Sequence, residues 1–167
     1  TGAAPPPHAL SDAPWGADVR VDDDPGAAVQ ESPAIAVDPN GNAYAVWEDY
    51  RNGYEDIYFS YRPAGGNWET NVMVNDGSFT GSADQGRASI AVDPWGNAFA
   101  VWAGQQFIVP WPPFVYYTLN SDYRPAGGNW GTDVTLSDVS QGRPDIAVDP
   151  NGNAYAVCAA WEDETRN

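Results

Sequence analysis

The nine residues Ile35-Ala-Val-Asp-Pro-Asn-Gly-Asn-Ala43 decide the fold, because the chain repeats them almost letter for letter at 90–98 and at 146–154. The aspartates of successive copies are 55 and 56 residues apart. A fixed spacing of this size is typical of one supersecondary unit that is copied along the chain. The repeat therefore predicts the architecture before any local propensity is considered.

Each copy has the pattern of antiparallel strands joined by short turns. In the first copy, residues 33–37 and 42–47 alternate as strands do, and Asp38-Pro-Asn-Gly41 between them has the residues of a type I turn. Residues 56–61 and 68–75 add a third and a fourth strand. Four-stranded antiparallel units repeated along a chain are the blades of a β-propeller. The sequence therefore predicts an all-β fold, a propeller of four-stranded antiparallel blades with about three blades per chain.

The repeat also sets the expected boundaries. Residues 1–14 form a Pro-rich segment, and residues 15–167 hold the propeller repeats. Within them we expect an outer strand of a split blade (15–31), a blade (32–76), a blade with a loop insertion (87–138) and the first half of the split blade (144–167). Three blades are too few to close a ring. The ring is then either part of a longer chain or completed by head-to-tail association, in which each copy donates its outer strand to the next.

Composition narrows the partners. The chain has 23 acidic residues against 7 basic ones, all arginine, for a net charge of −16. This charge disfavours nucleic acid and acidic membranes as partners. Cys158 is the single cysteine, so no internal disulfide forms, and no run of about 18 apolar residues is present to insert in a membrane. Because the chain starts at Thr1 and not at Met, we expect either a removed signal peptide or an excised piece, and an extracellular, secreted protein.

The turn between the third and fourth strands carries a family resemblance. Residues 60–68, Ser-Tyr-Arg-Pro-Ala-Gly-Gly-Asn-Trp, resemble the Asp-box of sialidase-like BNR-repeat propellers, and Tyr61–Trp68 recurs unchanged at 123–130. The motif's aspartate is replaced by Ala64 and by Ala126, so these are degenerate Asp-boxes. The resemblance implies a propeller fold and says little about activity, because Asp-boxes are structural in that family.

Three arginines are candidate ligand-binding residues. Arg87 and Arg143 each follow Gln-Gly just before a first strand, and Arg51 lies in a loop between a second and a third strand. These loops open on the same face of a propeller, where three guanidiniums could bind a carboxylate. The alternative is that the arginines pair with the abundant Asp and Glu side chains.

The insertion in the second copy supplies aromatic candidates. Phe107, Trp111 and Phe114 lie among three prolines in the one clear break of the repeat. Such a stiffened loop could offer a platform for sugars or for a partner's apolar surface. The alternative is a flap that folds over a hydrophobic edge.

The repeated Asp-x-Asn-x-Asn pattern at Asp38, Asn40 and Asn42 invites comparison with a calcium loop. Calcium requires six to eight oxygen ligands, and this pattern has few and no bidentate glutamate. A turn role explains the residues better, so no metal and no cofactor is expected.

The sequence thus favours a secreted, non-enzymatic, sialidase-like propeller module that is glycan-binding or structural, with no catalytic residue identified. Its expected partners are a glycan or an extracellular protein surface, and the chain is expected to be a homo-oligomer or part of a larger chain. One alternative is a fragment of a sialidase-like glycoside hydrolase. Another is a self-assembling filament or surface subunit that strand donation completes.

Overall fold

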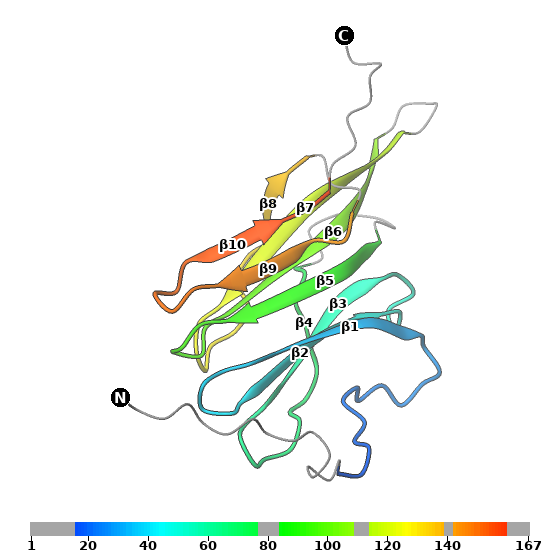
Figure 1. Ribbon diagram of the computed structural model, residues 1–167. Coiled ribbons are helices and arrows are strands. Elements are labelled where there is room, and N and C mark those ends of the chain that lie inside the picture. The colour runs from blue at the N-terminus through cyan, green and yellow to red at the C-terminus, as the bar shows by residue number, and fades with distance from the viewer. Residues whose placement is uncertain (1–15, 77–83, 109–113, 139–141, 160–167) are drawn as a thin grey trace.

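The computed structural model describes residues 16–76, 84–108, 114–138 and 142–159, which form an all-β structure without helices (Figure 1). The strands of the first sheet are β1 (Gln30–Val37), β2 (Ala43–Asp49), β3 (Asp56–Arg62) and β4 (Val72–Met73). Those of the second are β5 (Gln85–Val92), β6 (Ala98–Ile108), β7 (Phe114–Arg124) and β8 (Val134–Ser137). The third sheet contains β9 (Asp145–Val148) and β10 (Ala154–Val157).

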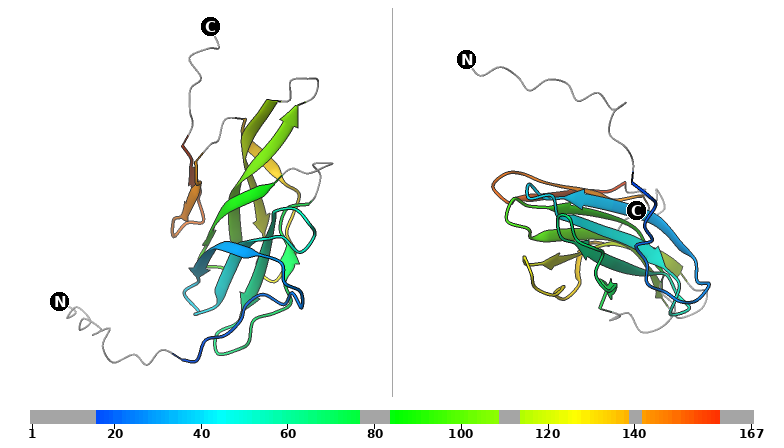
Figure 2. Two further views of the ribbon diagram at one scale, coloured as in Figure 1. Left: turned by 90° about the vertical axis from the view of Figure 1, so that its right-hand side faces the viewer. Right: turned by 90° about the horizontal axis from the view of Figure 1, so that it is seen from below.

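Each sheet is an antiparallel meander in chain order, β1-β2-β3-β4, β5-β6-β7-β8 and β9-β10. The sheets stack as successive layers, and the first strand of each copy contacts its equivalents, β1 with β5 and β5 with β9 (Figures 1 and 2). The four-stranded units that the repeat predicts are therefore present in the first two copies.

The repeated turns are held by their aspartates. The Gly41 N–H donates to the Asp38 carbonyl at 3.0 Å, and Gly41 has a φ of 83°, a value that glycine adopts without strain. The Asp38 carboxylate accepts hydrogen bonds from the backbone N–H groups of Asn40 and Asn42 and from the Asn42 side-chain amide. The same bonds form around Asp93 and Asp149. These carboxylates stabilise the turns, as the turn interpretation expects.

The main core lies between the first and second sheets. Tyr44, Val46 and Phe59 of the first sheet pack against Ile90 and Trp102 of the second. Trp102 and Val46 are fully buried. Successive side chains of a strand point to opposite faces of the sheet, and directly opposed residues of paired strands share a face. Each sheet therefore has one face toward the preceding sheet and one toward the following sheet.

The N-terminal segment departs from the expectation. Residues 16–29 form no strand, and β1 begins at Gln30, so the outer strand expected within 15–31 is absent from the described residues. Val21 instead packs beside Trp47 and Tyr58 on the face of the first sheet that is turned away from the second. The apolar face of the first sheet thus binds this segment, whereas the third sheet remains two-stranded in the described part of the chain.

The insertion in the second copy also differs from the expected loop. β6 and β7 continue into it as one long hairpin, paired without a break from Ala98↔Arg124 to Ile108↔Phe114. The aromatic and β-branched residues of this stretch favour extended pairing over a free loop. Residues 109–113 lie outside the described residues.

Candidate functional site

A polar cavity of about 360 Å³ lies where the first strands of the copies begin. Four carboxylates and two guanidiniums are among the groups that line it. Its lining residues include Glu31, Glu48, Glu55, Asp84, Arg87, Arg143, Gln105 and Tyr117.

The cavity is built from equivalent positions of the repeat. Ser32, Arg87 and Arg143 each stand three residues before the repeated isoleucine, and all three line the cavity. Glu48 and Ala103 form a second equivalent pair, one residue after the tryptophan of the second strand. The site is thus formed where the same corner of successive sheets converges.

Two of these corners carry unusual backbone geometry. Ser32 and Arg87 are non-glycine residues with positive φ, 51° and 60°. Each lies at an irregularity in strand pairing, between Glu31 and Ala34 in β1 and between Gly86 and Ser89 in β5. Bulges of this kind redirect side chains and are frequent beside functional sites.

Three glutamates form the centre of the site. Carboxylate oxygens of Glu31, Glu48 and Glu55 all lie within 4.8 Å of one another. The buried Glu48 accepts a hydrogen bond from the Arg87 backbone N–H, and Glu55 accepts one from the Tyr50 hydroxyl. The first of these bonds connects the glutamate cluster to β5 of the second sheet, and the second lies within the β2–β3 loop.

Gly86 gives the glutamates their room. A Cβ atom at this position would lie 3.1 Å from Glu48 Oε1 and 3.4 Å from Glu55 Oε2. The first of these contacts is tighter than ordinary van der Waals packing, so a side chain at Gly86 would push on the carboxylates. Glycine here keeps the cavity open beside the cluster.

Glu55 titrates close to neutrality. Burial and the neighbouring charges of Glu48, Asp84 and Glu31 raise its pKa to about 7. Desolvation and like charges both disfavour the ionised carboxyl. The group is therefore able to exchange a proton near pH 7, with the carboxylates of Glu31 and Glu48 close to it.

Arg51, the third of the candidate arginines, does not line this cavity. Its guanidinium pairs with Asp49 at 2.8 Å and with Asp23 at 2.7 Å, and it lies over the Tyr58 ring at 4.2 Å. The pKa of Asp49 is lowered, because hydrogen bonds from Arg51 and Trp47 outweigh the opposing effect of burial. The arrangement is the ion-pair alternative of the sequence analysis.

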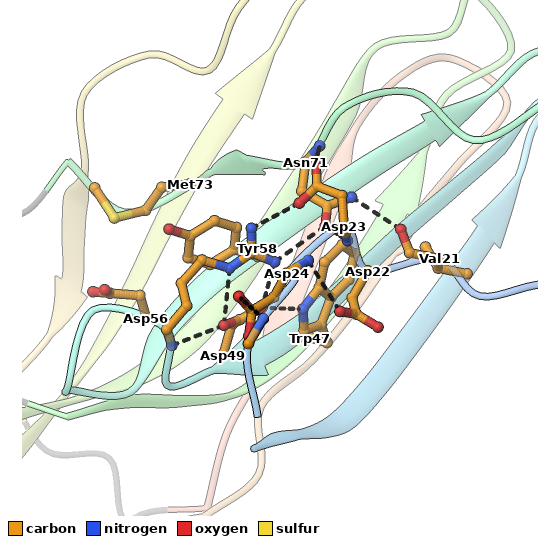
Figure 3. A network of polar contacts seen from close by, with 12 residues as sticks. Val21, Asp22, Asp23, Asp24, Trp47, Asp49, Asp56, Tyr58, Asn71 and Met73 are labelled. Atoms are coloured by element: carbon orange, nitrogen blue, oxygen red, sulfur yellow. Dashed lines mark hydrogen bonds and ion pairs between the residues drawn. The ribbon is translucent and has the colours of Figure 1, made fainter. Parts of the chain in front are cut away.

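This second cluster has a structural consequence. The Asn71 backbone N–H donates to the Asp23 side chain at 2.9 Å, and the Asp23 N–H donates to the Asn71 side chain at 2.6 Å. The Asn71 amide also donates to the Val21 carbonyl (Figure 3). Arg51 and Asn71 together hold the N-terminal segment on the first sheet.

The structure places two of the three aromatic candidates at one end of a hairpin. Phe107 lies near the end of β6 opposite Val115, and Phe114 opens β7 opposite Ile108. Trp111 lies outside the described residues. The three therefore belong to the β6–β7 hairpin and its connection, whereas Gln105 and Tyr117, farther from the tip, line the cavity.

The chemistry of the cavity follows from its groups. Carboxylates accept hydrogen bonds from hydroxyl or ammonium groups, while arginine, glutamine and tyrosine side chains donate them. The three glutamates are also the set, among the described residues, with carboxylates placed close enough to hold a cation. Three such oxygens are fewer than the six to eight that calcium takes.

Sequence reasoning missed the glutamates, although the repeat contains a signal for them. Glu31 stands where the other copies have Gly86 and Gly142. Glu48 stands where they have Ala103 and Ala159. A charged residue at a repeat position that is otherwise small is a departure from the repeat that is visible in the sequence alone.

Comparison with known proteins does not show a family for this chain. No family model and none of the curated proteins matches the chain. Among solved structures, the chain is similar to a cryo-EM structure of Morganella morganii TcdA4, with 10% identity and a TM-score of 0.47. The match covers 83% of this chain and 7% of that one. Among the described residues, no helix is long and apolar enough to cross a membrane.

Proposed function

We propose that the protein is a non-enzymatic, extracellular binding module of the sialidase-like propeller type, whose sheets are blades and whose cavity binds a glycan. The observation that carries the proposal is the convergence of Glu31, Glu48 and Glu55 with Arg87 and Arg143 around one cavity. Sugars present many hydroxyl groups, and a cavity with both acceptors and donors suits them.

The charges favour neutral or amino sugars over acidic ones. The lining has four carboxylates and two guanidiniums, and the chain carries a net charge of −16. An acidic sugar would meet repulsion from this field, whereas an ammonium group would be attracted. Arg51 is engaged with Asp49 and Asp23 and lies outside the cavity lining, so two of the three candidate arginines, Arg87 and Arg143, line the cavity.

Glycan-array binding tests the proposal, with Gly86→Ala as the decisive variant. The added methyl group reaches the glutamates and should reduce signals on neutral and amino glycans at least tenfold. Gly16→Ala is the matched control, because a Cβ there meets nothing within 4 Å. Absence of glycan signals from the wild type, or equal signals from both variants, would refute the proposal. Trp111→Ala on the same array tests separately whether the connection between β6 and β7 contributes to glycan binding.

A second candidate, a fragment of a glycoside hydrolase, is favoured by one observation. Glu55 has a pKa of about 7 and lies beside other carboxylates, as a general acid lies beside its partner in glycosidases. Turnover of fluorogenic glycosides, sialosides included, that disappears in Glu55→Gln would support hydrolysis. Absence of turnover together with retained glycan binding would support the binding module.

A further inference from the structure

The two ends of the stack expose faces that are buried elsewhere in the same molecule. Tyr44 and Val46 of the first sheet are 2% and 0% exposed, because the second sheet covers them. Their equivalents in the third sheet, Tyr155 and Val157, are 60% and 66% exposed. The third sheet therefore presents the forward face of the repeat, defined by Tyr155 and Val157, without a cover among the described residues.

The opposite end exposes the complementary face. Ile90 of the second sheet is 6% exposed because it packs on the first sheet. Its equivalent Ile35 is 63% exposed on β1, and Val37, the equivalent of Val92, is 58% exposed. We refer to the surface of Ile35 and Val37 as the backward face.

We propose that the forward face of one copy of this chain binds the backward face of a second copy. In the inferred contact, β1 of the second copy lies across β9 and β10, as β5 lies across β1, β2 and β3 within one chain. Ile35 and Val37 then pack against Tyr155 and Val157, as Ile90 packs against Tyr44 and Val46. The occupant is a second copy because the molecule already contains this interface between its own sheets.

The N-terminal segment leaves room for this contact. Val21 and Trp68 cover Trp47 and Tyr58, which lie on β2 and β3, and they leave Ile35 on β1 exposed. Within the chain, β5 is the strand of the second sheet that lies across β1, β2 and β3. Its equivalent β1 is the strand that remains open. Trp47, the equivalent of the core residue Trp102, stays under the N-terminal segment, so the contact between copies would use β1 and leave Trp47 out.

The two faces differ, so the association is heterologous and proceeds head to tail. This property gives a complementation test with the full chain. Tyr155→Asp removes the forward face and Ile35→Asp removes the backward face. Each variant should remain a single-chain species. Their mixture should form a dimer, because Tyr155→Asp keeps an intact backward face and Ile35→Asp keeps an intact forward face. The wild type should gain mass with concentration in sedimentation velocity.

Tyr54→Asp is the matched control, since Tyr54 is 49% exposed in the β2–β3 loop, outside both faces. It should associate as the wild type does. Circular dichroism first verifies that each variant is folded, and Val157→Asp replaces Tyr155→Asp if that variant is not. A wild type of single-chain mass at every concentration would overturn the proposal. So would a mixture that forms no dimer, or self-association that only the forward-face variant weakens. The glycan array tests the cavity independently of this result.

Discussion

The first and third sheets contain the same sequence pattern in opposite surroundings. Ala43–Asp49 in β2 is paired on both edges and covered by the second sheet. Ala154–Val157 in β10 is exposed throughout, and β9 is its one pairing partner in the part of the chain that the structure describes. The repeat therefore determines which face each residue occupies, and the presence of a neighbouring sheet determines whether that face is buried. A substitution should therefore cost more stability where a neighbouring sheet covers the residue than at the equivalent exposed position of the repeat.

The largest expected effect comes from the centre of the stack. Trp102 is fully buried, and its indole N–H donates to Gln85 at 2.8 Å, so Trp102→Ala should lower the free energy of unfolding by about 3–5 kcal/mol. Trp95 in the turn between β5 and β6 is 62% exposed, and Trp95→Ala should cost less than about 1 kcal/mol. Urea denaturation measures both, and equal losses would break the comparison.

A smaller effect compares equivalent valines directly. Val46→Ala should destabilise by about 2 kcal/mol, because the change opens a cavity in the core between the sheets. Val157→Ala should change stability by less than about 0.5 kcal/mol in dilute solution, where its side chain faces water. A similar loss in both variants would mean that the third sheet is covered within the single chain.

The smallest expected effect concerns the cavity. The pKa of Glu55 is about 7 in the folded protein against 4.5 for the ordinary side chain, so the folded state binds the proton more tightly. Its contribution to stability is present below about pH 4.5 and is lost as the pH rises to about 7. Glu55→Gln should therefore reduce the loss of unfolding free energy between about pH 4.5 and 7 by about 1 kcal/mol, a value that allows for the partial exposure of Glu55.

Asp133 is a second carboxyl group that contributes to the pH dependence of stability in the same range. Burial raises its pKa to about 7 as well, so part of the decline should persist in Glu55→Gln. Asp133→Asn serves as the parallel variant, and thermal unfolding at pH 5 and pH 8 reports the difference. An unchanged slope in Glu55→Gln would contradict the raised pKa and weaken the hydrolase alternative.

Sequence alone predicted the sheets, the turns and the convergence of Arg87 and Arg143 on one face, but not the glutamates that lie beside them. The turn at Asp38 was predictable because its carboxylate, proline and glycine act locally, within four residues. The glutamate cluster was not, because Glu31, Glu48 and Glu55 meet only when β1, β2 and the start of β3 bring one corner together. The path of residues 16–29 also depends on a distant contact, from Asp23 to Asn71.

Amide hydrogen exchange of β2 and β10, measured at low and high protein concentration, tests the central claim most directly. The account predicts that β10 amides exchange orders of magnitude faster than β2 amides in dilute solution, and that they slow as concentration rises and a second copy covers them. Equal protection of β2 and β10 in dilute solution, or β10 exchange that is independent of concentration, would contradict it.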